Sequence, residues 1–233
     1  MTNTIQARFN KNGNIKLGNM WTYSKLYHHK EFDTKYGKIK GTCGIYCNGC
    51  CESCYVRKSY RYGSVINGHA RNTLAFRLDL TKAFADLNSF IDRAKKKPDF
   101  IRINQSGEIE STAELKGWIY SATMHKSIKY YLYTKNFVVL KDVLKTDRLP
   151  ENITILISVW HKYGIKEYNE FKHLKNIKAF VYDDGFDYKA YGLNIETYCH
   201  AYDKNGKLNH DVTCDVCRKC IDRTCKVIGC YEH

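Results

Sequence analysis

The chain has 233 residues, 43% of them hydrophobic, which is enough for one or two domains with a substantial core. Its 38 lysines and arginines against 24 acidic residues give a formal net charge of +14, which favours a polyanionic or acidic partner. No apolar run reaches the roughly 20 residues of a membrane span, and the first ten residues lack the apolar segment of a secretory signal. We therefore expect a cytoplasmic protein without a membrane partner.

The first forty residues are polar and rich in glycine and asparagine. An alternating stretch at 4–9, the tight-turn pair Asn12-Gly13 and the apolar residues of 15–17 predict a small hairpin. We expect 1–42 to form this hairpin and an extension.

Helical and strand patterns alternate in the rest of the chain. Apolar residues at helical spacing predict a helix over 80–97, which ends in three lysines before Pro98. Ser111 and Glu114 have the spacing of a capping box at the start of a helix over 111–126. Further helices are predicted at 138–145 and 166–174, and strands at 100–103, 129–134, 153–159, 177–182 and 197–202.

This alternation predicts a parallel sheet built from βα units. The strand starts recur roughly every 25 residues, and a complete eight-stranded barrel needs roughly 250. We therefore expect an α/β fold of the incomplete (β/α) barrel class, with parallel strands and Cys-rich metal-binding segments near both ends. It would form a single domain over 1–233. Within it, the first cysteine group and a basic helix occupy 43–76, the βα units 77–203 and a Cys-rich segment 204–233.

Ten of the eleven cysteines lie in two dense groups. The first group is Cys43, Cys47, Cys50, Cys51 and Cys54, the second is Cys214, Cys217, Cys220, Cys225 and Cys230, and Cys199 stands apart. Disulfides are rare in intracellular proteins, and an odd number of cysteines cannot pair completely. Two cysteines with two residues between them let their thiolates converge on one metal ion. We therefore predict metal binding by both groups.

The spacing favours iron–sulfur clusters over zinc. Cys214, Cys217 and Cys220 have the spacing of ferredoxin-type clusters, which take a fourth, remote ligand. Zinc ribbons bring two Cys-x2-Cys pairs within about 20 residues of each other, whereas most of the chain separates these groups. We expect one or two clusters, at least one of the four-iron, four-sulfur type, with structural zinc as the alternative.

The first group can be divided in two ways. Cys43-x3-Cys47-x2-Cys50 fits the radical S-adenosylmethionine signature, in which three thiolates leave one iron open for the cofactor. That family usually has an aromatic residue before the last cysteine, and this chain has Gly49. The second frame is Thr42-Cys43-x6-Cys50-x3-Cys54-Tyr55.

The second frame, with the basic helix that follows it, resembles the phage gene product 88 family. The segments Phe100 to Glu108, Tyr131 to Lys135 and Cys199 to Cys220 continue this resemblance, which runs from about Asn14 to the end of the chain. The resemblance implies a trimmed relative of the radical S-adenosylmethionine barrel in a phage-type protein of the host cytoplasm. Its activity would be that of a radical enzyme or a degenerate descendant of one.

The resemblance also implies ligand sets. Cys43, Cys50 and Cys54 would hold a cluster with one open iron, and Cys199, Cys214, Cys217 and Cys220 a second, closed one. Ser106-Gly107-Glu108 stands where the superfamily has a Gly-Gly-Glu that contacts S-adenosylmethionine. Four further cysteines, Cys47, Cys51, Cys225 and Cys230, depart from the family and leave the ligand sets open.

Other polar residues follow predicted parallel strands, whose carboxyl ends form sites in such sheets. Asn104, Thr134, Ser158 and Asp183 could line one pocket with Glu108, although each is also an ordinary strand terminus. Glu108 could equally belong to a turn that leads to Ser111. Walker, Gly-x-Gly-x-x-Gly and Gly-x-Ser-x-Gly motifs are absent, so nucleotide hydrolysis and serine-hydrolase chemistry have no support.

Cations alternate with tyrosines after Cys54. Arg57, Lys58, Arg61 and Arg71 are candidates for contact with nucleic acid, since cations bind phosphates and tyrosines stack on bases. A solvated helix face is the simpler interpretation of the same residues. The alternative function is accordingly a non-enzymatic nucleic-acid-binding or host-interaction protein, in which the metal only stabilises the fold.

Overall fold

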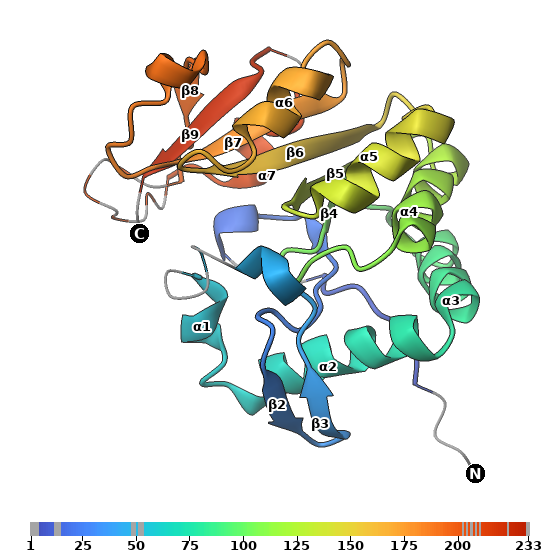
Figure 1. The fold of residues 1–233 in the computed structure, drawn as a ribbon. Helices are drawn as coiled ribbons and strands as arrows, with labels where there is room; N and C mark the ends of the chain where they lie inside the picture. The colour runs from blue at the N-terminus through green and yellow to red at the C-terminus, as the bar shows by residue number, and fades with distance from the viewer. Residues whose placement is uncertain are drawn as a thin grey trace.

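A computed structural model describes residues 5–11, 15–47, 50, 54–201, 203, 205, 207, 209, 211–222 and 224–231, without the side chains of Ile15, Ile45 and Cys47. The described residues form a seven-stranded sheet and a separate two-stranded one (Figure 1). The strands of the large sheet are, in spatial order, β1 (Trp21–Thr22), β4 (Phe100–Ile103), β5 (Lys129–Thr134), β6 (Ile153–Trp160), β7 (Ile177–Asp183), β9 (Val227–Tyr231) and β8 (Thr197–Tyr198). Every neighbouring pair is parallel.

The helices connect these strands. They are α1 (Val56–Ser59), α2 (Gly63–Leu78), α3 (Leu80–Asp92), α4 (Thr112–Met124), α5 (Phe137–Thr146), α6 (Ile165–Phe171) and α7 (Cys214–Cys217), with the 3-10 turns η1 (Ile15–Leu17), η2 (Gly44–Cys47) and η3 (Lys189–Tyr191). The main-chain N–H of Glu114 donates to Ser111 Oγ at the start of α4, as the capping box predicts. The predicted parallel α/β sheet is confirmed, and β5 has the predicted bounds.

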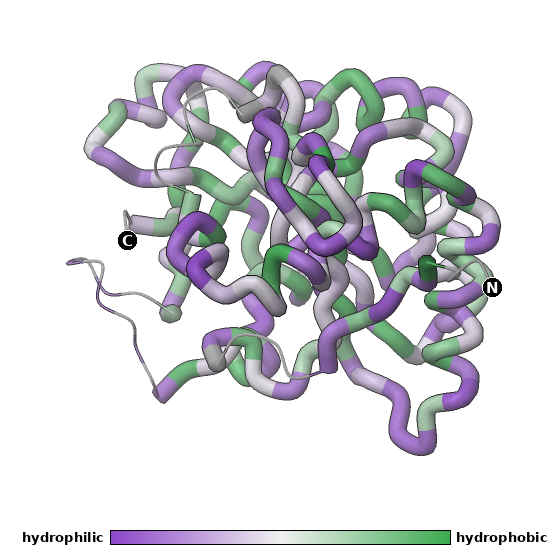
Figure 2. The backbone as a smooth tube through the Cα atoms, turned by 90° about the horizontal axis from the view of Figure 1, so that it is seen from below, coloured by the Kyte–Doolittle hydropathy of each residue, from purple (hydrophilic) through white to green (hydrophobic). Residues whose placement is uncertain are grey.

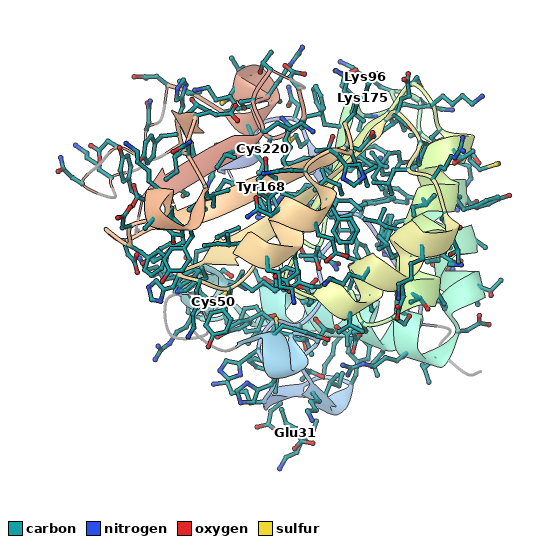
Figure 3. All side chains as sticks on the ribbon, turned by 45° about the horizontal axis from the view of Figure 1, so that its top comes forward. Glu31, Cys50, Lys96, Tyr168, Lys175 and Cys220 are labelled. Carbon is teal, nitrogen blue, oxygen red and sulfur yellow. The ribbon has the colours of Figure 1, made fainter. Side chains whose placement is uncertain are left out.

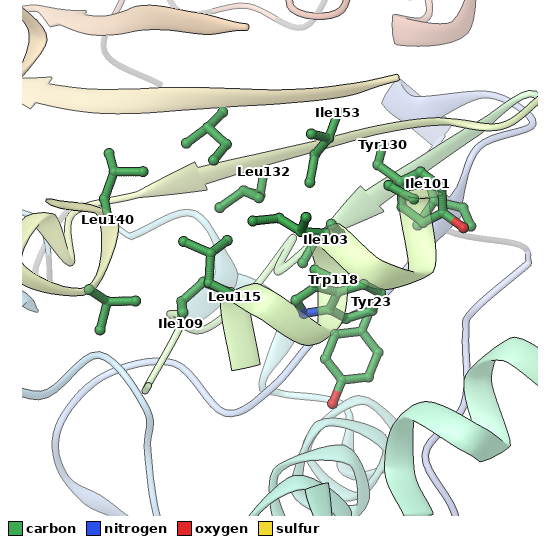
Figure 4. Packing of buried hydrophobic residues seen from close by; sticks show 14 of the residues in the cluster. Tyr23, Ile101, Ile103, Ile109, Leu115, Trp118, Tyr130, Leu132, Leu140 and Ile153 are labelled. Atoms are coloured by element: carbon green, nitrogen blue, oxygen red, sulfur yellow. The ribbon is translucent and has the colours of Figure 1, made fainter. Parts of the chain in front are cut away.

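The two faces of the sheet have different coverings. Alternate strand residues such as Ile101, Ile103 and Leu132 pack with Leu115 and Trp118 of α4 in the main core (Figure 4). Helices α4, α5 and α6 follow one another along this face (Figure 1).

The intervening strand residues point to the opposite face. Phe100, Tyr131 and Leu156 there pack with Leu17 of η1 and Ile221 of the C-terminal segment, in a second core. The helices thus cover one face, and the two cysteine-bearing ends of the chain approach the other.

The prediction of a hairpin from the residues of 4–17 is wrong, because the hairpin lies farther along the chain. Residues 15–17 form η1, a 3-10 turn, and Asn10 makes an isolated bridge with Thr22 at the edge of the sheet. Packing explains this, because Leu17 is fully buried in the second core, whereas an isolated hairpin is marginally stable. The antiparallel hairpin consists of β2 (Glu31–Thr34) and β3 (Gly37–Lys40). The turn pair Asn12-Gly13 lies outside the described residues.

Three other predicted elements differ in extent. The helix over 80–97 ends at Asp92, which leaves Lys95, Lys96 and Lys97 in an exposed loop. Pro98 restricts the residue before it to extended backbone, and three adjacent like charges disfavour a further turn. The basic helix after Cys54 is broken into α1 and α2, and the strand over 197–202 has only two residues.

Hydrophilic residues predominate along the outer loops, and hydrophobic ones run through the middle of the molecule (Figure 2). Among the described residues, none of the helices combines the length and the hydropathy needed to cross a bilayer.

Candidate metal centre

A cavity of about 210 Å³ lies against the face of the sheet that the helices leave uncovered. The carboxyl ends of the strands contribute Arg102 of β4, Tyr133 of β5, Ser158 of β6, Tyr182 of β7 and Cys230 of β9. These side chains share the cavity because alternate residues of a strand point to the same face. The position agrees with the rule that sites in parallel sheets form at the carboxyl ends of strands.

Both cysteine groups reach this cavity. Its walls include Cys50 and Cys54 of the first group, Cys214, Cys220 and Cys230 of the second, and Cys199. Figure 3 labels Cys50, from the segment before α1, and Cys220, from the segment after α7. Residues more than 160 positions apart in the chain therefore form one site.

The electrostatic contacts between thiols follow the two groups. Cys43 and Cys54 both interact with Cys50. In the second group, Cys214 interacts with Cys199 and Cys217, and Cys220 interacts with Cys199 and Cys214. Cys230 shares a hydrogen bond with Cys199. The contacts thus group Cys43, Cys50 and Cys54 on one side and Cys199, Cys214, Cys217, Cys220 and Cys230 on the other, and the ligand sets stay a prediction.

The thiols surround the cavity without converging on one point. Within the described part of the chain, no three histidine, cysteine, aspartate or glutamate side chains lie close enough together to hold a metal ion. The side chain of Cys47 and all of Cys51 lie outside the described residues. The structure therefore leaves the choice between the two frames of the first group open.

Burial raises the pKa of several thiols in and beside the cavity, although the hydrogen bond from Cys230 lowers the pKa of Cys199 to about 5. Burial raises the pKa of Cys43 to about 12, and the Glu108 carboxylate and Cys50 act in the same direction. Burial, with the neighbouring Cys199, likewise raises the pKa of Cys220 to about 12. A metal that coordinates such a thiol displaces its proton, so metal binding here would release protons.

Two half-buried cations, Arg102 and Lys135, face the thiols. The guanidinium of Arg102 lies 4.7 Å from the centre of the Tyr133 ring, and among the described residues its Nε has no hydrogen-bond partner. Lys135 is hydrogen-bonded to Cys50; burial opposes its charge, but Cys50 and Glu108 raise its pKa on balance. A buried charge is costly unless it is compensated, so the cavity suits an anionic group.

Asn104 lines the cavity, and its side-chain amide is unsatisfied among the described residues. It is only 4% exposed and has a left-handed backbone, with φ +47. Both its amide nitrogen and its amide oxygen lack hydrogen-bond partners among the described residues. The amide is therefore free to bond to a polar ligand or to water in the cavity.

Glu108 is held by the protein itself. Its Oε1 accepts hydrogen bonds from Thr134 Oγ1 and the main-chain N–H of Ile109, both at 2.8 Å, and its Oε2 accepts one from the N–H of Lys135 at 2.8 Å. Thr42 Oγ1 accepts from the N–H of Glu108 at 2.9 Å. Glu108 therefore ties the loop after β4 to the end of β5, beside Cys43.

The other two residues of this motif are also packed tightly. Ser106 Oγ donates to the carbonyl of Lys25 at 2.9 Å. Gly107 has φ +83, and a Cβ there would lie 2.6 Å from Thr42 Oγ1, so only glycine fits without a shift. These contacts explain the Ser-Gly-Glu sequence structurally, and cofactor contact by Ser106, Gly107 and Glu108 stays a prediction.

Of the polar residues predicted at strand ends, Asn104 and Ser158 line the cavity. Thr134 is bonded to Glu108, and Asp183 accepts a hydrogen bond from the Tyr198 hydroxyl at 2.6 Å. The sequence analysis missed Arg102 and Lys135. Arg102 had a signal, since it is a charged residue inside a strand of apolar ones.

The predicted nucleic-acid residues lie away from the cavity. Arg57 and Lys58 are exposed on α1, and Arg61 is exposed over the ring of Tyr62 at 4.8 Å. Arg71 is partly buried on α2. Lys58 and Arg61 line one surface hollow, and Arg71 lines the neighbouring one.

The comparison with known proteins decides the family. The sequence profile described as Gene product 88 matches residues 4–226. The chain belongs to the Gene product 88 family. The match confirms the resemblance seen in the cysteine frame, and the matched range contains every predicted ligand of this Gene product 88 protein. No curated protein and no solved structure matches the chain.

Proposed function

We propose that this Gene product 88 protein binds iron–sulfur clusters at the cysteine-lined cavity of an incomplete (β/α) barrel. The observation that carries the proposal is the meeting of both cysteine groups in one cavity with the half-buried cations Arg102 and Lys135. Thiolates are the soft ligands that such clusters take, and the two cations offset the negative charge of a thiolate-bound cluster.

The arrangement of layers supports the incomplete barrel. Helices α4, α5 and α6 lie on one face of the parallel sheet, as the outer helices of a barrel do. In the described residues β1 and β8 are the two edges of the sheet and are not paired with each other. The inner face is covered by η1 and the C-terminal segment.

The spread of the thiols supports a cluster over a single zinc ion. Four thiolates around one zinc ion would lie within about 4 Å of each other, because each Zn–S bond is about 2.3 Å. The ligands of a four-iron cluster each bind a different iron and are farther apart. Six described cysteines line one cavity of about 210 Å³, and a cluster would bridge such a set of thiols better than one ion would.

The ligand sets assigned here are Cys43, Cys50 and Cys54 for an open cluster and Cys199, Cys214, Cys217 and Cys220 for a closed one. An open iron would supply one-electron chemistry to S-adenosylmethionine, and a closed cluster would relay electrons or stabilise the fold. Asn104 and Arg102 offer that cofactor the unpaired polar atoms of the cavity wall. Glu108 would contact it only by exchanging one of its present hydrogen bonds.

Metal analysis tests the proposal. Protein purified without oxygen is expected to be brown and to contain stoichiometric iron and sulfide. Cys220→Ser should lose iron, whereas Cys225→Ser should keep it, because Cys225 lies outside the cavity wall. A colourless protein that contains zinc would overturn the proposal and would select the alternative, a non-enzymatic protein with a structural metal.

Titration of the reconstituted protein with S-adenosylmethionine tests the enzymatic part. We expect binding, weakened about 10-fold or more by Asn104→Ala or Glu108→Ala, since a hydrogen bond to a charged group contributes about 1.5–3 kcal/mol. Asp183→Asn is the matched control, because Asp183 also ends a strand but does not line the cavity. Absence of binding to protein with full iron content would remove the cofactor and leave the clusters.

A further inference from the structure

Arg8 and Arg71 lie side by side at the edge of the sheet, and among the described residues the structure gives neither of them an acidic partner. Asn72 fixes this arrangement, because its Oδ1 accepts from the main-chain N–H of Arg8 and its Nδ2 donates to the Arg8 carbonyl, both at 3.0 Å. Within the described residues, the buried Nε of Arg71 has no hydrogen-bond partner. Burial, and then the charge of Arg8, lower the pKa of Arg71. Two like charges held together in this way indicate an anion between them.

The surroundings of the pair suit a phosphate group. Arg8 and Arg71 line a hollow of about 340 Å³ together with the hydroxyl-bearing residues Thr22, Ser24 and Ser64. Its described lining contains no acidic residue. Arginine and hydroxyl side chains are the usual donors to phosphate oxygens.

Two further hollows continue this one along the β1 edge. A hollow of about 460 Å³ shares Asn10 and His69 with it and adds Lys58 and Arg61. On the other side, a groove of about 860 Å³ begins at Lys11, next to Asn10 in the chain. Its cations are Lys11, Arg93, Lys95, Lys96, Lys97 and Arg218.

The three hollows together are strongly basic. Their described lining has ten lysines and arginines against two acidic residues, Asp99 and Asp215. The Asp215 carboxylate already accepts hydrogen bonds from the N–H of Asn19 and the hydroxyl of Thr213. Lys96 extends from the surface of the molecule (Figure 3).

We infer that this basic groove along the β1 edge binds single-stranded nucleic acid. Successive cationic hollows fit the successive phosphates of one strand, and Tyr62, which is 51% exposed beside Arg61, offers a ring on which a base can stack. Apart from Lys58 on α1 and Arg71 on α2, the cations lie outside helices and line hollows, so they suit a flexible strand better than the groove of a duplex. The inference is independent of the clusters. It keeps Lys58, Arg61 and Arg71 from the sequence analysis and adds residues as far as Arg218.

The salt dependence of binding tests the inference. The probes are fluorescent DNA and RNA single strands of about 12 nucleotides, a length within the usual site sizes. Arg8→Gln combined with Arg71→Gln is expected to weaken binding of both and to reduce the slope of log K against log salt by about 1.4, since each phosphate contact contributes about 0.7. Lys166→Gln with Lys189→Gln removes the same charge from α6 and η3, outside the three hollows, and should leave the slope unchanged.

A second variant tests the inference if the protein with Arg71→Gln does not fold. Lys95, Lys96 and Lys97 are exposed in a loop, so their joint change to glutamine should fold and reduce the slope by about 2 if all three contact phosphates. The inference is overturned by absence of binding at low salt, by an equal loss in the Lys166 and Lys189 control, or by equally tight binding of a duplex of the same length.

Discussion

Joint replacement of Cys214, Cys217 and Cys220 with serine is expected to abolish the second cluster and to unfold the C-terminal segment. The helix α7 that carries two of these residues has only four residues, too few for an isolated helix. When a metal site is absent from the unfolded chain, metal-binding energy becomes folding energy. We expect a large loss of stability, because Ile221 and Ile228 of this segment also cover Tyr131 and Leu156 in the second core.

The measurement combines iron content with thermal unfolding, both without oxygen. Cys225→Ser is the matched control, since Cys225 is a buried cysteine of the same segment that is not an assigned ligand. An iron-free triple variant that is as stable as the parent would contradict the proposed coupling of metal binding and folding.

Lys25→Met is expected to destabilise the protein by about 3–5 kcal/mol at neutral pH, because it leaves a buried carboxylate unpaired. The side chain of Lys25 is fully buried, and its Nζ lies 2.7 and 2.8 Å from the two carboxylate oxygens of Glu114. Its main chain also holds the Ser106-Gly107-Glu108 loop, since the N–H of Lys25 donates to the Ser106 carbonyl at 2.9 Å. Denaturant unfolding of the parent protein and of the Lys25→Met variant measures the difference in their free energies of unfolding.

The pH dependence of this penalty provides a second readout. Burial raises the pKa of Glu114, and Lys25 partly lowers it again. Without Lys25 the folded state should prefer the protonated carboxyl, so the penalty should grow as pH rises above the ordinary carboxyl range and shrink in acid. Adding Glu114→Gln to Lys25→Met should recover much of the loss at neutral pH. A penalty that is independent of pH and of Glu114 would contradict an electrostatic origin.

Local sequence patterns determined the parallel strands and their helices. The apolar stretches that became β4, β5, β6 and β7 and the periodic helices between them depend on contacts within a few residues and on burial of one face. The same reasoning failed at 15–17, where Leu17 is buried by distant residues, and it missed β9, which carries two of the C-terminal segment's buried apolar residues, Val227 and Ile228.

The cysteine spacing likewise predicts which residues act together, and the family match confirms the resemblance that rests on it. It could not show that both groups meet in one cavity. That depends on β9 inserting between β7 and β8, and on η1 and the C-terminal segment packing on the face that the helices leave uncovered.

Only the tertiary structure showed which polar residues face the cavity. Glu108 satisfies its carboxylate within the protein, while Asn104 and Arg102 present unpaired polar atoms to the cavity. Likewise, Arg8 meets Arg71 through the amide of Asn72, across more than 60 residues. Residue type and spacing determined which candidate groups for metals and anions the chain carries. Which of them remain unpaired was decided by hydrogen bonds between distant segments, because a polar group that the fold has already satisfied has less to offer a ligand.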